Sequence, residues 1–225
     1  MPYYGYSDPA IWGTFQWSER FPSHYELRDY FQHVAKVWDL HRDVVLRTRV
    51  YEARYEDGRW RVKTAVGRTS EPAGEWSCKW LIAATGTSFK PYTPTWSGME
   101  KFKGSLHHSA LWPEEPVDMS NKRVAVIGAG STGVQVMQEA AKVASTCTQF
   151  IKTPNLAVPM RQRQVTEEEI YQNKAMFPHV FKACKGGTRT GLPITNSGRR
   201  VFDDDEETRH KLWEEQWKRG GFNWY

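Results

Sequence analysis

The sequence has no long hydrophobic run. Within its 225 residues, no apolar stretch approaches the roughly 18 residues that a membrane-spanning helix needs. The N-terminus also lacks the basic and apolar regions of a signal peptide. Lysine plus arginine number 31 against 26 acidic residues, and no basic run stands out, so nothing suggests a nucleic-acid arm. We expect a cytoplasmic protein without membrane or nucleic-acid partners.

Cysteine is also scarce. Cys78, Cys147 and Cys184 are odd in number and widely spaced, and none belongs to a Cys-x-x-Cys pair. Their scatter argues against a disulfide framework and against a zinc site, and favours a reducing compartment. A Gly-x-Ser-x-Gly nucleophile elbow is absent as well. We therefore expect no metal centre and no serine nucleophile of that type.

Aromatic residues, in contrast, are plentiful at 14% of the chain, with 11 tryptophans, and they indicate large apolar contact surfaces. Ser23 and Glu26 have the spacing of a helix-starting capping box. Apolar residues then recur at helical spacing and predict a helix that ends near residues 39–42. This stripe consists of Leu27, Tyr30, Phe31, Val34 and Trp38.

The pattern beyond residue 43 is typical of strands. Two runs, 50–55 and 60–66, flank Asp57-Gly58 and predict a β-hairpin. The apolar runs 44–46 and 80–84 have the same character, and the second ends in Thr85-Gly86. Residues 166–174 and 206–219 are the best helical stretches near the C-terminus. The fold class is therefore α/β with a β-hairpin or meander insertion.

A glycine motif follows the short apolar strand predicted at 123–127. Gly128, Gly130 and Gly133 have the spacing Gly-x-Gly-x-x-Gly, and a helix is predicted from there to about residue 143. Such glycines allow a tight turn, close approach of a pyrophosphate and close helix–strand packing. The sequence thus predicts a dinucleotide site; the alternative is a glycine-rich turn that serves packing alone.

The end of the next strand distinguishes NAD from NADP. We expect this strand at 148–152, and no carboxylate lies between Ala140 and Thr166 to hold a ribose hydroxyl. Lys152 stands where a 2′-phosphate would need a cation, which favours NADP. The alternative is an ordinary solvated lysine.

A second motif precedes the glycine motif. Phe102, Gly104, His108 and Trp112, followed by Pro113, form a turn with aromatic anchors and one imidazole. With its neighbours, this string resembles the fingerprint of flavin-dependent Baeyer–Villiger monooxygenases, a class of flavoprotein monooxygenases. The resemblance extends to five further segments, which are residues 17–22, 84–86, 128–135, 152–155 and 217–222.

This resemblance implies an activity and a set of roles. In that family NADPH reduces FAD, and a flavin peroxide then inserts oxygen next to a ketone carbonyl, so the substrate would be a ketone or another apolar small molecule. His108 would have a coupling role on the linker, together with Phe102, Gly104 and Trp112. Lys152 and Thr153 would contact the 2′-phosphate. The residues expected to hold the NADP pyrophosphate are Gly128, Gly130, Ser131, Thr132, Gly133 and Gln135.

The resemblance also divides the chain. Residues 1–86 would be a partial FAD-type domain and residues 87–117 the linker. Residues 118–160 would start an NADP-binding domain, and residues 161–225 would be a mainly helical insertion that is truncated. Both nucleotide-binding parts are expected to be Rossmann-like. The family's first glycine motif and its acidic and arginine catalytic segments have no counterpart here.

Three interpretations remain open, and we favour the first. The chain is part of a longer enzyme, or it assembles with a second chain or a second copy that covers exposed sheet edges. The third interpretation is a short relative without flavin chemistry. Such a protein would bind small molecules or act as a cofactor-independent isomerase or cyclase, with His107, His108 or a carboxylate as proton carrier.

Overall fold

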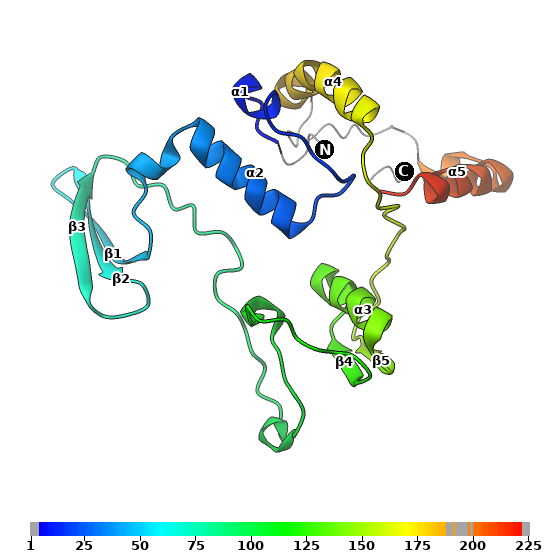
Figure 1. Ribbon diagram of the computed structural model, residues 1–225, viewed down its shortest axis with the longest axis horizontal. Helices are drawn as coiled ribbons and strands as arrows, with labels where there is room; N and C mark the ends of the chain where they lie inside the picture. The colour runs from blue at the N-terminus through cyan, green and yellow to red at the C-terminus, as the bar shows by residue number, and fades with distance from the viewer. Residues whose placement is uncertain (1–4, 188–190, 192–197, 199, 222–225) are drawn as a thin grey trace. The chain divides into compact units, whose positions relative to one another are not determined.

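The protein is mixed α/β and consists of two compact units. A computed structural model describes residues 5–187, 191, 198 and 200–221. The first unit comprises Met1–Cys78 and Val158–Tyr225, and the second comprises Lys79–Ala157 (Figure 1). Within the described residues, no helix is long and apolar enough to cross a membrane.

Two helices near the N-terminus enclose the core of the first unit. Helix α1 spans Pro9–Trp12 and helix α2 spans His24–Val37. The predicted helix start is confirmed, since the Ser23 side chain accepts a hydrogen bond from the Glu26 amide. The other half of the expected capping box is absent, because Glu26 Oε1 instead accepts from the Ser18 amide at 2.5 Å. Glu26 thereby ties the preceding loop to α2.

The apolar stripe of α2 is buried only in part. Tyr30 and Val34 are buried, and they pack with Ile11 and Trp17. Phe31 and Trp38 remain 51% and 40% exposed, because they lie outside the face of α2 that packs on the core. That face contains residues 27, 30 and 34, which follow each other at i, i+3 and i+7. A short 3-10 helix, Leu40–Asp43, follows α2.

Three antiparallel strands follow in the order β1-β2-β3. They are β1 (Thr48–Glu56), β2 (Arg59–Val66) and β3 (Pro72–Cys78). The predicted hairpin is confirmed, and its turn residues Asp57 and Gly58 have φ of 50° and 75°, as a tight type I′ turn requires.

One expectation for this region was wrong, and one strand was not predicted. Residues 44–46 form no strand. The polar segment 72–78, which contains proline and glycine, forms β3 because pairing with β2 supplies its hydrogen bonds. Strand pairing of this kind overrides the weak intrinsic preference of such residues.

Two longer helices lie in the C-terminal part of the first unit. Helix α4 (Glu167–Gly186) begins with a complete capping box between Thr166 and Glu169. The predicted helix over 166–174 was too short, since α4 continues through Pro178 although proline usually ends a helix. Helix α5 (Glu206–Arg219) has the predicted bounds, and the Asp205 side chain caps it.

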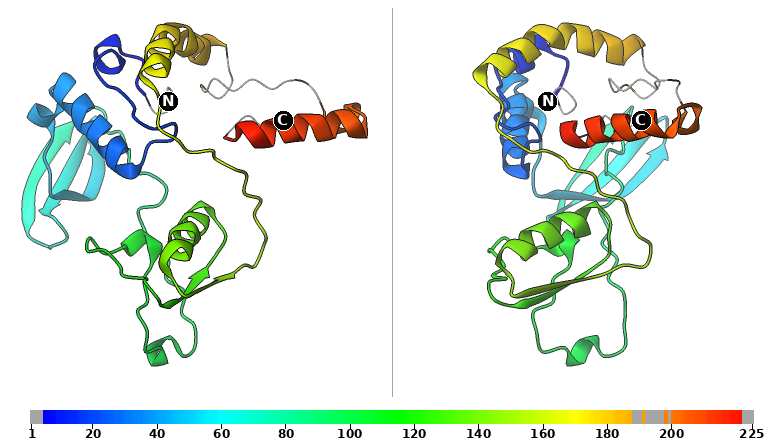
Figure 2. Two further views of the ribbon diagram at one scale, coloured as in Figure 1. Left: turned by 45° about the vertical axis from the view of Figure 1, so that its right-hand side comes forward. Right: turned by 90° about the vertical axis from the view of Figure 1, so that its right-hand side faces the viewer.

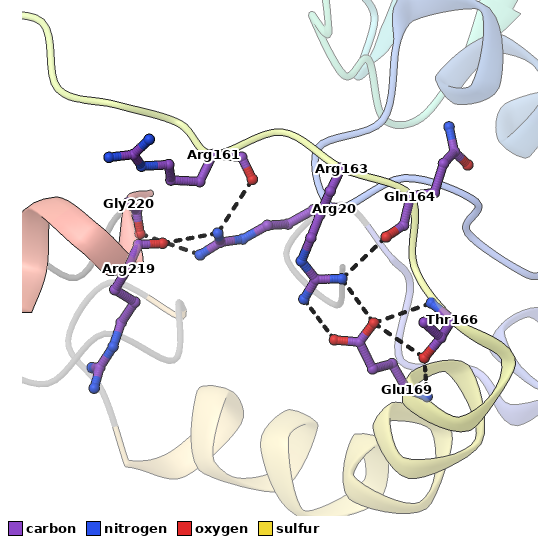
Figure 3. A network of polar contacts seen from close by, with 8 residues as sticks. All are labelled: Arg20, Arg161, Arg163, Gln164, Thr166, Glu169, Arg219 and Gly220. Carbon is purple, nitrogen blue, oxygen red and sulfur yellow. Dashed lines mark hydrogen bonds and ion pairs between the residues drawn. The ribbon is translucent and has the colours of Figure 1, made fainter.

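The N-terminal loop is hydrogen-bonded both to the segment before α4 and to the end of α5. The Arg20 amide donates to the Arg163 carbonyl, and the Val165 amide donates to the Ser18 carbonyl. The Arg20 guanidinium donates to the carbonyls of Arg219 and Gly220, at 2.9 and 3.2 Å (Figure 3). Phe222, the last residue of the matched segment 217–222, lies outside the described residues.

The second unit is built on a parallel strand pair. Strand β4 (Arg123–Ile127) leads into helix α3 (Ser131–Val143) and then into β5 (Thr146–Phe150), which pairs with β4 in parallel. Val126 and Ala140 are buried between the strands and the helix. The predicted β4 and α3 are confirmed. The expected strand at 148–152 was wrong in its bounds, because pairing with β4 ends at Ile127 opposite Phe150.

The apolar run 80–84 forms no strand in the structure. Trp80 and Ile82 are 79% and 86% exposed. A strand needs a neighbour to satisfy its backbone groups, and no described strand pairs with this run. The rest of the linker region contains two short 3-10 helices, Met99–Lys101 and Ser109–Leu111.

Candidate nucleotide-binding site

The turn between β4 and α3 is fixed by contacts with β5. Gly128 has φ +109°, a conformation that side-chain-bearing residues rarely adopt. Its amide donates to the Phe150 carbonyl at 2.9 Å, and the Gln149 side-chain amide donates to the Gly128 carbonyl at 3.0 Å. Hydrogen bonds to both the amide and the carbonyl of Gly128 therefore hold the turn against the end of the neighbouring strand β5.

The other two glycines of the motif differ in their surroundings. A Cβ atom on Gly133 would lie 2.4 Å from the Gly128 carbonyl oxygen, so only glycine lets α3 approach the turn this closely. A Cβ atom on Gly130 would meet nothing within 4 Å. The backbone at Gly130 is thus open to a ligand, and this open surface fits the close approach of a pyrophosphate.

The N-terminus of α3 is available to an anion. Gly130 is the N-cap residue, and no side chain caps this end. The first backbone bond of the helix runs from the Val134 amide to the Gly130 carbonyl, which leaves the amides of Ser131, Thr132 and Gly133 outside the helical ladder. Such amides and the positive end of the helix dipole favour phosphate. Gln135 is exposed one turn further along.

The segment after β5 is held beside the same turn. The Asn155 side-chain amide donates to the Ala129 carbonyl at 3.2 Å. Lys152 and Thr153, both exposed, therefore lie between two points of attachment, the Phe150 carbonyl and Asn155. This tether keeps the two residues near the glycine turn.

Lys152 also differs from the lysines on either side of the turn. Lys122 pairs with Asp118 at 3.3 Å, and Lys142 pairs with Glu139 at 2.7 Å. Hydrogen bonds from Ser120, together with Lys122, lower the pKa of the Asp118 carboxyl. Among the described residues Lys152 has no such carboxylate partner, so its charge is available for an external phosphate.

Sequence reasoning assigned no role to Gln149 or Asn155. Gln149 lies in a short strand, Thr146–Phe150, that is largely polar, so its sequence gives no signal that marks it. Asn155 stood within the matched segment 152–155, but its contact with Ala129 depends on how the chain returns after β5.

The linker motif is arranged separately, around His108. The Ala110 amide donates to His108 Nδ1 at 3.1 Å, and His108 Nε2 lies 3.0 Å from the Tyr92 carbonyl oxygen. Since an amide can only donate and a carbonyl can only accept, these contacts select the neutral tautomer with hydrogen on Nε2. Both ring nitrogens therefore hold the linker backbone, which suits a positioning role.

The remaining fingerprint residues each contact a residue nearby in the linker. A Cβ atom on Gly104 would lie 2.6 Å from the Phe102 ring, so the ring covers this glycine. The rings of His107 and Trp112 lie 5.7 Å apart. The residues predicted from sequence thus form two groups, one at the glycine turn and one in the linker.

Titratable clusters are sparse in the part of the chain that the structure describes. No three histidine, cysteine or acidic side chains there are placed to share a metal ion. The three cysteines are free and only partly buried. The glycine turn is accordingly the best-defined binding feature of these residues.

The chain matches a known family model over most of its length. The model is described as flavin-binding monooxygenase-like and covers residues 6–186. An FAD-binding monooxygenase of Aspergillus aculeatus is 39% identical over 99% of this chain and 37% of its own length. Cyclopentanone 1,2-monooxygenase of a Comamonas species is 38% identical over 99% of this chain and 40% of its own.

Solved structures give the same result. A steroid monooxygenase bound to NADP superposes with a TM-score of 0.86 at 31% identity, over 98% of this chain and 41% of that chain. A cyclohexanone monooxygenase bound to ε-caprolactone superposes with a TM-score of 0.87 at 29% identity, over 98% and 42%. The chain therefore spans about 40% of the length of these relatives.

Proposed function

The chain belongs to the flavin-binding monooxygenase-like family, and from this premise we propose that it contributes the NADP-binding turn and the linker of a Baeyer–Villiger monooxygenase. The proposed activity is NADPH- and FAD-dependent insertion of an oxygen atom next to a ketone carbonyl. One observation carries the proposal, namely the open backbone at Gly130 in front of the uncapped helix α3. The similarity to cyclopentanone 1,2-monooxygenase supports a ketone substrate.

The roles of the residues at the turn follow from their chemistry. The first amides of α3 and the backbone at Gly128 and Gly130 would hold the pyrophosphate of NADP. Lys152 would bind the 2′-phosphate, and the Thr153 hydroxyl would donate a hydrogen bond to it. Gln135 would contact the pyrophosphate from the exposed face of α3. When bound, NADPH supplies a hydride.

The described residues fit NADP and offer no separate phosphate-binding turn for FAD. The described residues contain one strand–glycine–helix turn, and we assign it to NADP. A second phosphate-binding turn is not present among them. FAD is proposed as a cofactor of the whole protein because relatives such as the Aspergillus enzyme are FAD-binding.

His108 would position the linker. Its two ring nitrogens are engaged by backbone groups of Tyr92 and Ala110, so proton transfer by this imidazole would require breaking one of these bonds. We therefore propose that His108 couples the nucleotide-binding parts by fixing the linker backbone. No observation among the described residues favours the flavin-free isomerase or cyclase.

Nucleotide preference tests the proposal. Isothermal titration of the purified protein with NADP⁺ and NAD⁺ should give tighter binding of NADP⁺. Lys152→Ala should weaken NADP⁺ binding about tenfold or more, because a charge-assisted hydrogen bond is worth about 1.5–3 kcal/mol. The same variant should leave NAD⁺ binding nearly unchanged, because NAD⁺ has no 2′-phosphate.

Lys101→Ala is the matched control. Lys101 is an exposed lysine of the same unit and lies in the short helix Met99–Lys101, so its loss should change neither affinity. Equal affinities of the original protein for both nucleotides would overturn the assignment of Lys152. The absence of binding by either nucleotide would overturn the assignment of the glycine turn.

A further inference from the structure

A groove in the first unit lies apart from the glycine turn. It is formed where α1 meets the second half of α4, two helices that lie side by side (Figures 1 and 2). Its volume is about 530 Å³, within the range typical of small-molecule sites. We call it the α1–α4 groove; its lining residues are Ser7, Pro9, Trp12, Pro178, Phe181, Lys182, Lys185 and Gly186.

The floor of the groove is apolar and held rigidly. The Trp12 ring packs edge-on against Phe177 at 5.8 Å, and Phe177 packs against Phe181 at 5.8 Å. Phe177 is 5% exposed, so it anchors both rings. Lys174 Nζ donates to the Gly13 carbonyl at 3.0 Å and fixes the end of α1 on α4. The groove is therefore formed before any ligand arrives.

Two prolines strengthen this arrangement. Pro9 opens α1, and Pro178 stands inside α4. Neither has a backbone N–H, and each has a fixed φ. The apolar rings of both residues thus line the groove without adding a donor that a ligand would have to satisfy.

The rim of the groove carries positive charge alone. Pro178, Phe181, Lys182 and Lys185 follow each other at i, i+3, i+4 and i+7 and so share one face of α4. Both lysines are exposed, and among the described residues neither has an ion-pair partner. No acidic side chain is among the residues that line the groove.

An apolar floor beside two ammonium groups that pair with no described carboxylate complements a ligand with an apolar body and an anionic end. We propose that the α1–α4 groove binds a small amphipathic carboxylate, with its hydrocarbon part on Trp12 and Phe181 and its carboxylate between Lys182 and Lys185. Ser7 also lines the groove, and a serine hydroxyl can donate a hydrogen bond. This site is independent of the nucleotide site, because it uses none of its residues.

Octanoate is a suitable probe for isothermal titration, with octanol and octyltrimethylammonium as neutral and cationic analogues. Octanoate should bind more tightly than either analogue, and its affinity should fall as salt is raised, because exposed charges are screened. Equal binding of octanol and octanoate would overturn the proposal.

Two variants locate the site. Lys182→Gln combined with Lys185→Gln should weaken octanoate binding about fivefold or more and leave octanol binding unchanged. Phe181→Ala should weaken all three probes, since it removes part of the floor. Circular dichroism checks that both variants retain the helical content of the original protein.

The matched control is Lys211→Gln combined with Lys218→Gln, two exposed lysines on α5. An equal loss of octanoate affinity in this control would overturn the assignment to the groove. NADP⁺ titration of the Lys182→Gln and Lys185→Gln protein should be unchanged, which separates this proposal from the assignment of the glycine turn.

Discussion

Gly130 and Gly133 lie three residues apart yet face different constraints. Gly130→Ala should leave the thermal midpoint nearly unchanged and abolish most NADP⁺ binding, because the new methyl group enters open space that the pyrophosphate would occupy. Gly133→Ala should lower stability by about 1–3 kcal/mol through overpacking against the Gly128 carbonyl. Thermal unfolding and NADP⁺ titration of both variants measure the two effects.

Gly186→Ala serves as the control for the helical position. Gly186 lies in the last turn of α4, and a Cβ atom there would meet nothing within 4 Å. Its replacement should be neutral or slightly stabilising. If Gly130→Ala retained full NADP⁺ affinity, the backbone at this glycine would not be the place where the pyrophosphate approaches.

Local motifs could be predicted from sequence at the scale of single residues, and contacts across the chain could not. The glycine turn depends on neighbours in sequence, and its strand and helix are present as expected. Gln149 holds Gly128 across a separation of 21 residues. The contact from Asn155 to Ala129 spans 26 residues. Such pairings depend on parallel strand register, which a single sequence does not reveal.

The start of α4 depends on one carboxylate. Hydrogen bonds from Arg163 and from the Thr166 amide lower the pKa of Glu169 to about 2, and Arg163 contacts it at 2.6 Å (Figure 3). A pKa lowered on folding stabilises the protein above the ordinary carboxyl pKa. This stabilisation is lost as the pH falls from about 4.5 towards 2.

Glu169→Gln should therefore lower the thermal midpoint at neutral pH, because it removes the charge that pairs with Arg163, while the glutamine oxygen can still accept from the Thr166 amide. The difference from the original protein should stay constant above about pH 5 and shrink at lower pH. Thermal unfolding followed by circular dichroism between pH 7 and pH 3 measures this difference.

Glu167→Gln is the matched control for this prediction, since Glu167 lies in the same first turn of α4 and its side chain has no hydrogen bond or ion pair to another described residue. It should change the midpoint less, through the helix dipole alone. A midpoint difference for Glu169→Gln that persisted unchanged down to pH 3 would contradict the proposed role of the charged carboxylate.

Elements with local start signals could be predicted, and elements that depend on a partner could not. The caps at Ser23 and Asp205 mark the starts of α2 and α5. Helix α4 continues past Pro178 because its face packs on α1 through Phe177. Strand β3 exists because β2 pairs with it. The run 80–84 has strong strand character and no described strand beside it, so it remains without regular structure.

Apolar side chains are widely exposed among the described residues. Within the described residues β4 and β5 pair only with each other, and Ile127 and Phe150 are 59% and 57% exposed. Parallel sheets are usually buried on both faces. The chain spans about 40% of the length of its relatives. The expectation that a second chain or a second copy covers these edges stays a prediction.

The domain boundaries at residues 86, 117 and 160 also stay predictions. The division into two compact units follows contacts within each unit and joins Met1–Cys78 to Val158–Tyr225. This union was beyond sequence reasoning because it depends on the bonds of Arg20 and Ser18 to residues more than 140 positions away.

The most direct test of the account is NADP⁺ titration of ¹⁵N-labelled protein observed by amide NMR. We predict saturable shifts of the amide signals of Ser131, Thr132 and Gly133, the first residues of α3, with smaller shifts when NAD⁺ replaces NADP⁺. Unchanged signals at this turn, or shifts confined to other residues, would contradict the assignment of the turn to NADP.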